Sequence, residues 1–241
     1  MNDSKTEFMI IGTRQQLAKL NFSTLKVANV VVESVSDLRN LGSIFDEHMS
    51  MSAHIQNKCK TSFYHLYNIS KIRNILDDKS CEMLIHSLIF SQLDYCNSLL
   101  YGVPNCELVK CQRVINSAAR LVCKERKYCH ITPLLSKLHW LPISYRIQFK
   151  ILLLVFKCLN DMAPVYLTNF IKIRRRNRSS RHRPLMLEVP FVRRATLAAR
   201  AFDYAGPFLW NSLPADIVTA QSISDFKTKL KTHFMKIAYD L

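Results

Sequence analysis

The chain has 241 residues, and its 34 Lys and Arg against 18 Asp and Glu give a formal net charge of +16 and a pI near 9.7. Hydrophobic residues make up 49% and charged residues 22%, a balance typical of globular proteins rather than of disordered chains. The longest strongly apolar run, residues 151–156, is too short to span a bilayer, and the N-terminus does not resemble a signal peptide. The charge predicts nucleic acid as the first candidate partner and an anionic membrane surface as the second, with an inert basic surface as the alternative.

The N-terminal segment is predicted to be β-rich. Residues 5–46 contain three short apolar or β-branched stretches, 5–12, 25–34 and 38–46, which indicate a small antiparallel sheet. From about residue 50 the apolar period becomes helical. The buried face of this first helix is expected to contain Met51, Ile55, Cys59, Phe63, Leu66 and Ile69.

The second predicted helix covers residues 77–102. Asp77 and Asp78 suit the positive end of a helix dipole, and Gly102 is typical of a C-terminal cap. Because its polar stripe is narrow, we expect this helix to be a core element.

The third predicted helix, about 105–126, has the most informative charge pattern. Its inner face is expected to contain Leu108, Cys111, Ile115, Ala118, Ala119 and Val122. Four cations project from the opposite face: Lys110, Arg113, Arg120 and Lys124. A cationic row without alternating acidic residues favours contacts with nucleic acid, and a solvated outer face is the alternative.

Beyond it, Pro142 and Pro164 bracket a helix of about twenty residues, which is expected at the centre of a bundle. Residues 172–200 contain ten Lys and Arg against one Glu and have no helical period over 173–184, which predicts an exposed basic arm. A short strand is expected in 183–192 and an amphipathic helix after Ser222. The inward residues of that helix are expected to be Ile223, Phe226, Leu230, Phe234 and Ile237.

Little in the sequence indicates catalysis. The eight cysteines do not have the spacing of a compact zinc knuckle, and we expect reduced, packed thiols of an intracellular protein. Asp46, Asp94 and Asp203 are isolated in the sequence, so we expect no metal site and no polymerase or nuclease centre. Most aromatic residues are expected in the core, although base stacking is possible for Tyr64, Tyr67, Tyr95, Tyr101, Trp140, Tyr145 and Trp210.

An ordered series of blocks runs through essentially the whole chain. It consists of KTEFMIIG (5–12), NLGSIFDEHMSMSAHI (40–55), LIFSQLDYCNSLLYGVP (88–104), CQRVINSAARLV (111–122), HITPLLSKLHWLPISYRIQFKILLLVFKCLNDMAPVYL (130–167), RAFDYAGPFLWNSLP (200–214) and FKTKLKTHF (226–234). Together they resemble the C-terminal region of the reverse transcriptases of LINE-type, non-LTR retrotransposons in the jockey and chicken-repeat clades.

The resemblance implies part of an RNA-directed DNA polymerase. Lys5 matches a late-palm motif, and Leu41 and Gly42 match the hairpin that grips the primer end. The helices over 50–170 would be thumb and post-thumb, lying along a template–primer duplex. The catalytic aspartates and their Mg²⁺ belong to earlier palm motifs that are not in this sequence. We therefore expect a truncated, inactive copy that holds no cofactor.

We accordingly expect a mainly α fold with a small N-terminal β portion, in which a thumb-like helical bundle follows a remnant of the palm sheet. The expected domains are a palm remnant at 1–48, the bundle at 49–171, and a basic arm with a C-terminal helical region at 172–241. RNA or DNA, in the form of template–primer or element RNA, would bind Lys110, Arg113, Arg120, Lys124, Arg174, Arg175, Arg176 and Arg178.

Location is expected to be intracellular, in nucleus or cytoplasm, without membrane association. Self-association is possible through the surface that a palm would cover. Two other functions are weighed against nucleic-acid binding. One is a stand-alone or domesticated helical protein-interaction module, and the other is an independent enzyme.

Overall fold

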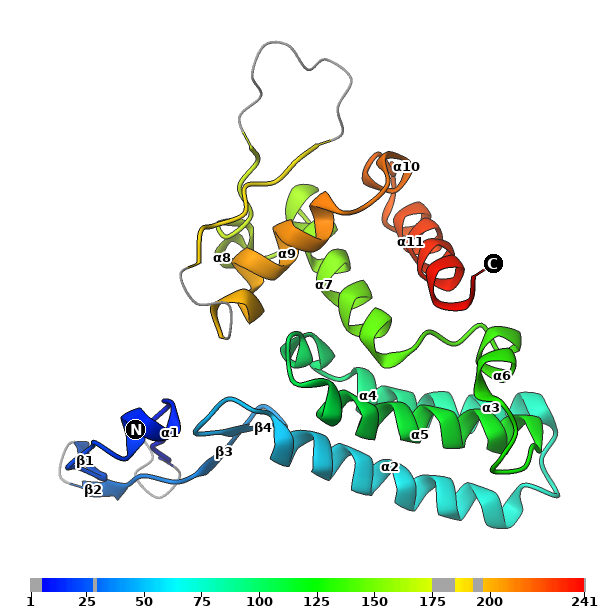
Figure 1. The fold of residues 1–241 in the computed structure, drawn as a ribbon, viewed down its shortest axis with the longest axis horizontal. Helices are drawn as coiled ribbons and strands as arrows, with labels where there is room; N and C mark the ends of the chain where they lie inside the picture. The colour runs from blue at the N-terminus through cyan, green and yellow to red at the C-terminus, as the bar shows by residue number, and fades with distance from the viewer. Residues whose placement is uncertain (1–5, 28–29, 175–184, 193–196, 241) are drawn as a thin grey trace.

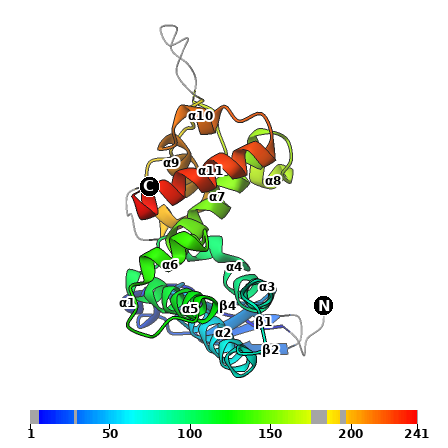
Figure 2. The ribbon, with the colours of Figure 1, turned by 90° about the vertical axis from the view of Figure 1, so that its right-hand side faces the viewer.

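The structure is a computed structural model that describes residues 6–27, 30–174, 185–192 and 197–240. These residues form a mainly helical protein with a small N-terminal β part, which confirms the predicted fold class (Figure 1). The helices form two layers, a lower one built on α2 to α5 and an upper one built on α7 to α11 (Figure 2).

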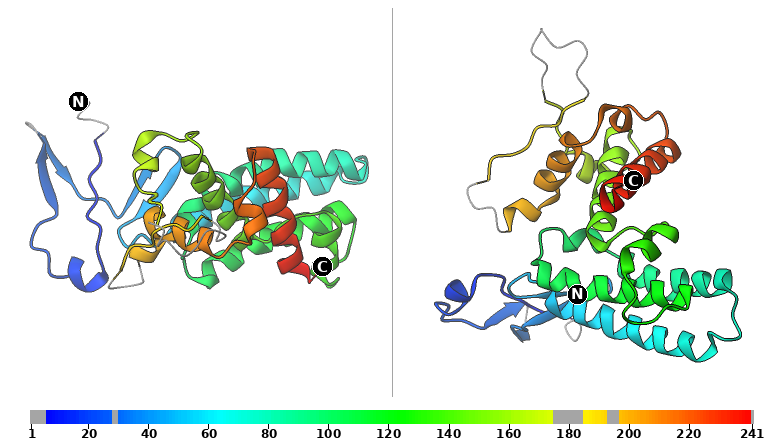
Figure 3. Two further views of the ribbon diagram at one scale, coloured as in Figure 1. Left: turned by 90° about the horizontal axis from the view of Figure 1, so that it is seen from above. Right: turned by 45° about the vertical axis from the view of Figure 1, so that its right-hand side comes forward.

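The N-terminal part contains a short helix and two separate β-hairpins that project from one end of the lower layer (Figure 3). Its elements are α1 (Arg14–Leu17), β1 (Thr24–Val27), β2 (Val30–Glu33), β3 (Asp37–Asn40) and β4 (Ser43–Asp46). β1 pairs antiparallel with β2, and β3 pairs antiparallel with β4. The predicted single sheet is therefore corrected to two hairpins. The predicted strand near 5–12 does not form over its described residues, where Phe8 makes one isolated bridge to Ser34.

The lower layer contains two long helices, α2 and α5, that pack side by side. Its elements are α2 (Ser52–Ile72), α3 (Asp78–Ile85), the π-helical turn η2 (His86–Phe90), α4 (Ser91–Asp94), the 3₁₀ turn η3 (Asn97–Leu100) and α5 (Asn105–Cys123). The Sγ atoms of Cys59 and Cys111 lie 4.0 Å apart between the two long helices. Apolar residues at three- and four-residue spacing place most of the α2 buried face as predicted. Phe63 is the exception, because its side chain is 44% exposed.

The prediction of one helix over 77–102 is wrong beyond its start. Asp77 caps the helix as expected, and its carboxylate accepts the Ser80 N–H at 3.2 Å. After Ile85 the hydrogen bonding changes to that of the π-helical turn η2. The helical segment ends after α4, where the Tyr95 backbone is extended and the Cys96 backbone is left-handed at φ 54°. Local apolar periodicity does not report such a change in hydrogen-bond register.

The upper layer surrounds α7. Its elements, with the short linking helix α6, are α6 (Ile131–Lys137), α7 (Ile143–Leu159), α8 (Val165–Thr168), the 3₁₀ turn η4 (Ala198–Arg200), α9 (Phe202–Asn211), α10 (Ala215–Val218) and α11 (Ile223–Tyr239). Pro142 precedes α7 as predicted, and α7 packs against both α9 and α11, across the predicted domain boundary at 171. The rings of Phe156, Phe226 and Trp210 stack in the centre of this layer.

Two expectations about the C-terminal region are wrong. Ile237, predicted to face inward on α11, is 50% exposed, whereas Phe226, Leu230 and Phe234 are buried as predicted. The predicted strand in 183–192 reduces, over its described residues, to one bridge between Leu187 and Ile173. In the described part of the chain, none of the helices has the length and apolar character needed to cross a membrane.

Candidate nucleic-acid interface

The face of α5 opposite the core carries the predicted cationic row. The buried side chains of this helix are Cys111, Val114, Ile115, Ala118, Ala119 and Val122. Because residues three and four apart share a helix face, burial of this stripe leaves Arg113 exposed on the other side. Leu108 is half-buried against the core rather than fully inside. The helix also ends earlier than predicted, at Cys123.

Lys110 differs from the rest of the row because it has an acidic partner. Its Nζ lies 2.8 Å from Glu107 Oε1 and 2.9 Å from Oε2, one turn back on the helix. Hydrogen bonding to this carboxylate raises the pKa of Lys110. The prediction of a row without acidic partners is wrong at this residue, and a paired surface lysine adds little attraction for a polyanion.

The other three cations of the row differ in their freedom. Arg113 and Lys124 are exposed, and neither side chain forms an ion pair with any residue that the structure describes. Lys124 follows the helix as its left-handed C-cap, at φ 55°. Arg120 is half-buried and donates from Nη2 to the Cys129 carbonyl at 3.2 Å, while its buried Nε has no partner in the described chain. Arg120 therefore anchors the loop after α5 as well as adding charge.

The C-terminal ends of α2 and α5 border an open groove of about 520 Å³. Four cationic side chains and one carboxylate line it: Arg73, Arg120, Lys124, Lys127 and Glu125. Lys127 is an exposed cation of the following loop that the helical pattern did not single out. The free positive charge of the groove comes from Lys124 and Lys127, because Arg73 is buried and paired with Asp78.

Arg73 is a second residue of this groove that sequence reasoning missed. It is 4% exposed, and its guanidinium donates to the carbonyls of Leu121 at 2.8 Å and Val122 at 2.7 Å. A third bond runs to the Leu76 carbonyl, and Asp78 forms an ion pair with it. The sequence does contain a signal for the burial of Arg73, because this residue continues the three- and four-residue spacing of the buried residues Leu66 and Ile69 on α2.

Two exposed aromatic rings lie on α2 beside the α5 row. Phe63 and Tyr67 are 44% and 60% exposed, and the ammonium group of Lys71 lies 4.3 Å from the Tyr67 ring centroid. Tyr67 is one turn from Ser70, which lines the groove. Of the predicted stacking candidates, Trp140 and Trp210 are buried and present no ring face to a base.

The predicted primer-grip hairpin is a tight turn between β3 and β4. Leu41 is 84% exposed at φ 45°, and Gly42 has φ 81°, a conformation that glycine adopts without steric cost. The Tyr95 hydroxyl donates to the Leu41 carbonyl, and the Ile44 N–H donates to His54 Nδ1 at 3.2 Å. These contacts fix the hairpin to the helical layer, on the β4 end of α2.

Of the remaining predicted cations, Arg174 is the one that the structure describes. Arg174 is exposed in the segment after α8, where its backbone N–H donates to the Met186 carbonyl at 3.0 Å. Lys5, Arg175, Arg176 and Arg178 lie outside the described residues.

Two of the isolated aspartates, Asp46 and Asp94, have structural partners. Burial raises the pKa of the Asp46 carboxyl, but bonds donated by the backbone N–H groups of His48, Ser50 and Met51 outweigh it and leave this pKa lowered. Asp94 pairs with Arg146. Within the described residues, no group of three or more His, Cys, Asp or Glu side chains has a metal-binding arrangement.

Comparison of the chain with protein-family models, with curated proteins and with solved structures finds no match.

Proposed function

We propose that this chain binds nucleic acid through the α2–α5 surface, defined by Phe63, Tyr67, Arg113, Arg120, Lys124 and Lys127. The carrying observation is that Arg113, Lys124 and Lys127 are exposed cations without carboxylate partners in the described chain, beside a groove with positive excess. Cations of this kind neutralise phosphates and release counterions, which gives sequence-neutral affinity.

The resemblance to LINE reverse transcriptases makes this surface the counterpart of a thumb that grips a template–primer. An A-form-like hybrid would be read there by its shape and backbone rather than by base edges. We assign binding, and not polymerisation, to this chain alone. Asp46 and Asp94 are engaged by backbone N–H groups and by Arg146, which supports that assignment. An intracellular location, in nucleus or cytoplasm, belongs to the same proposal.

A salt-dependent titration tests the proposal. Binding of an RNA–DNA hybrid would be measured by fluorescence anisotropy between about 50 and 200 mM salt, where phosphate contacts lose affinity steeply. The variant R113Q/K124Q/K127Q should bind more weakly and lower the slope of log K against log salt by roughly 2 to 3, since each phosphate contact contributes about 0.9.

A matched control removes the same charge elsewhere. K172Q/K227Q/K236Q changes three exposed lysines outside the α2–α5 surface and should leave the slope nearly unchanged. No binding at low salt, a flat salt dependence, or equal effects of the two triple variants would contradict the proposal.

We also propose self-association through the β1–β2 hairpin, which a specific observation supports. Phe22, Leu25 and Val31 are 57%, 44% and 62% exposed on or beside a two-stranded sheet. Exposed apolar surface of this kind favours association. Sedimentation velocity should show dimers or larger species that L25K/V31K abolishes, and a monodisperse wild-type monomer would contradict it. A helical protein-interaction module without nucleic-acid binding would show this association and no salt-dependent titration.

A further inference from the structure

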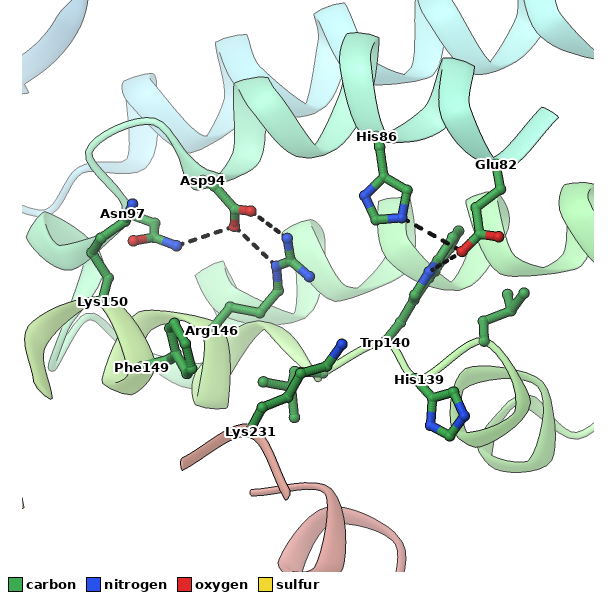
Figure 4. Close-up of a pocket in the computed structure, with 12 residues that line it drawn as sticks. Glu82, His86, Asp94, Asn97, His139, Trp140, Arg146, Phe149, Lys150 and Lys231 are labelled. Atoms are coloured by element: carbon green, nitrogen blue, oxygen red, sulfur yellow. Dashed lines mark hydrogen bonds and ion pairs between the residues drawn. The ribbon is translucent and has the colours of Figure 1, made fainter. Parts of the chain in front are cut away.

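A pocket of about 330 Å³ lies where the two helical layers meet (Figure 4). Its walls come from α3, η2 and α4 in the lower layer, from the segment between α6 and α7, and from α7 and α11. None of its lining residues belongs to the α2–α5 surface. Pockets of this size between packed layers are frequent sites for small ligands.

Both carboxylates of the pocket already have partners within it. Asp94 accepts from Arg146 Nε at 2.9 Å and from Asn97 Nδ2 at 3.2 Å. Glu82 accepts from the Trp140 indole N–H at 3.1 Å, and its Oε1 lies 3.5 Å from His86 Nε2. Neither acidic group is left to neutralise a further cation.

Two lysines reach the pocket without any such partner. Lys150 comes from α7 and Lys231 from α11, and neither side chain has a hydrogen bond or ion pair with a residue that the structure describes. Figure 4 shows Lys231 approaching the pocket from α11, on the side opposite Glu82 and His86. Lys150 lies at the other end of the pocket, beside Asn97 (Figure 4), so the two lysines leave an excess of positive charge along the pocket, which favours an anionic occupant.

The backbone around the pocket is irregular in two places. η2, which carries His86, is a π-helical turn, and such turns recur at functional sites. His139 has a left-handed backbone at φ 52°, a conformation that costs energy for a residue other than glycine. The conformation of His139 belongs to the end of α6, where the Trp140 N–H donates to the Leu135 carbonyl at 2.9 Å and the His139 N–H to the Ser136 carbonyl at 3.0 Å, so η2 is the irregularity that a helix end does not explain.

From these features we propose that the pocket binds a small organic phosphate, such as a nucleoside monophosphate. The Lys231 ammonium group would bind the phosphate, and Lys150 adds positive potential from the other end of the pocket, which favours a phosphate dianion over a single carboxylate. Leu138, Leu141 and Phe149 provide an apolar wall for the organic part. The phosphate can belong to a free nucleotide or to the 5′ end of a strand. This site does not depend on nucleic-acid binding by the α2–α5 surface.

The two tryptophans of the chain provide a probe with an internal control. The Trp140 indole N–H donates to Glu82 on the pocket wall, whereas the Trp210 indole N–H donates to the Leu185 carbonyl elsewhere. In ¹H–¹⁵N spectra of the full chain, adenosine 5′-monophosphate should shift the Trp140 indole signal saturably and leave the Trp210 signal in place. Adenosine, which lacks the phosphate, should not shift Trp140 at the same concentration.

Matched double variants complete the test. K150Q/K231Q should weaken adenosine monophosphate binding by roughly tenfold or more, with an unmoved Trp210 signal showing that the fold is intact. K157Q/K236Q removes the same charge from the same two helices outside the pocket and should bind like the wild type.

A 5′-phosphorylated trinucleotide that binds more tightly than the mononucleotide identifies a strand end as the source. The proposal would be overturned if adenosine monophosphate caused no Trp140 shift at concentrations up to about 10 mM, since a specific site should have a dissociation constant below that value. Equal shifts by adenosine, or unchanged binding by K150Q/K231Q, would also overturn it.

Discussion

Arg73 occupies a core position and closes the end of a neighbouring helix. The last carbonyls of a helix have no hydrogen-bond partner within it. At the end of α5, the Arg73 guanidinium donates hydrogen bonds to two of them, the carbonyls of Leu121 and Val122. Arg73→Met keeps the volume but leaves these carbonyls without their donors, which should lower the free energy of unfolding by about 2–4 kcal/mol. Urea denaturation of the wild type and the variant measures this difference in the free energy of unfolding.

The control for this prediction is the other end of the same ion pair. The Asp78 side chain is 73% exposed, so Asp78→Asn should cost less than about 1 kcal/mol. Equal losses in the two variants would show that the ion pair, rather than the capping of α5, carries the stabilisation.

His54 predicts how the stability of the chain depends on pH. Its ring is buried, and its Nδ1 accepts the Ile44 N–H. Burial, with a smaller contribution from the charge of Lys58, lowers the pKa of His54 below its usual value near 6.5. The folded state therefore disfavours the protonated ring, while the unfolded chain takes up the proton freely. Stability should be complete above about pH 6.5 and decrease as pH falls toward the lowered pKa.

His54→Gln isolates this contribution, because the glutamine oxygen can still accept the Ile44 N–H but does not titrate. The free energy of unfolding, measured from about pH 7.5 to 5, should decrease less steeply in this variant. Burial also lowers the pKa of His233, so part of the slope should remain. Identical slopes in the wild type and the variant would contradict the role given to His54.

At the scale of elements, periodicity predicted most helices but not their interruptions. The apolar stripes of α2, α5 and α11 are strong because each helix buries one face. The breaks at η2 and Cys96 lie in a segment that packs against α2 and α7, and local periodicity does not record such packing. The same limit applies to Phe63, whose apolar character fits the core while its position on α2 turns it toward solvent.

The candidate site was predictable to a similar degree. The spacing of Arg113 and Lys124 placed both on the outer face of α5, but it did not reveal that Glu107 neutralises Lys110 or that Arg120 holds the Cys129 carbonyl. Arg73 and Lys127 join the groove through the packing of α2 against α5 and the path of the following loop. Such contacts between distant segments follow from tertiary structure and not from periodicity.

The exposed face of α2 predicts a contact with unpaired bases in addition to the backbone contacts that a duplex makes with the α2–α5 surface. An aromatic ring on a surface can stack with a base whose face is free, which a duplex does not offer. Tyr67→Ala should therefore weaken binding of a single-stranded RNA by about 1–3 kcal/mol, while binding of a duplex stays within error. Anisotropy titrations at one salt concentration compare the two.

A tyrosine of similar exposure on another helix is the matched control for Tyr67. Tyr166 on α8 is 66% exposed, against 60% for Tyr67, and lies in the upper layer. Tyr166→Ala should leave both affinities unchanged. If Tyr67→Ala weakened duplex and single-strand binding equally, the ring would contribute to packing or to backbone contacts rather than to stacking.

At the scale of the whole molecule, a few polar contacts join segments that are distant in sequence. Arg200, predicted as part of an exposed basic arm, is half-buried and donates to the carbonyls of Met49 at 2.7 Å and Tyr101 at 3.1 Å. The Tyr239 hydroxyl, near the C-terminal end of α11, donates to the Trp140 carbonyl. These contacts hold the upper layer on the lower one, so we expect the two layers to unfold as one cooperative unit.

Gly102 offers a direct test of the Arg200 contact. It has φ +71°, and a Cβ added there would lie 2.5 Å from Arg200 Cγ. Gly102→Ala should thus combine backbone strain of about 1–2 kcal/mol with displacement of the Arg200 side chain from its carbonyls. Arg200→Ala removes those bonds directly, at roughly 1–3 kcal/mol. Since both variants break the same contact, the double variant should be less destabilised than the sum of the singles, by about 1 kcal/mol.

The comparison with Gly42 separates this coupling from strain alone. Gly42 has a similar φ of +81°, and the side chain that a new Cβ would meet there is Tyr95, at 3.5 Å, rather than Arg200. Gly42→Ala and Arg200→Ala should therefore add within about 0.5 kcal/mol in urea denaturation. Additivity in both cycles would mean that the methyl group added at Gly102 does not displace Arg200 from its carbonyls, and would contradict the coupling predicted between these two residues.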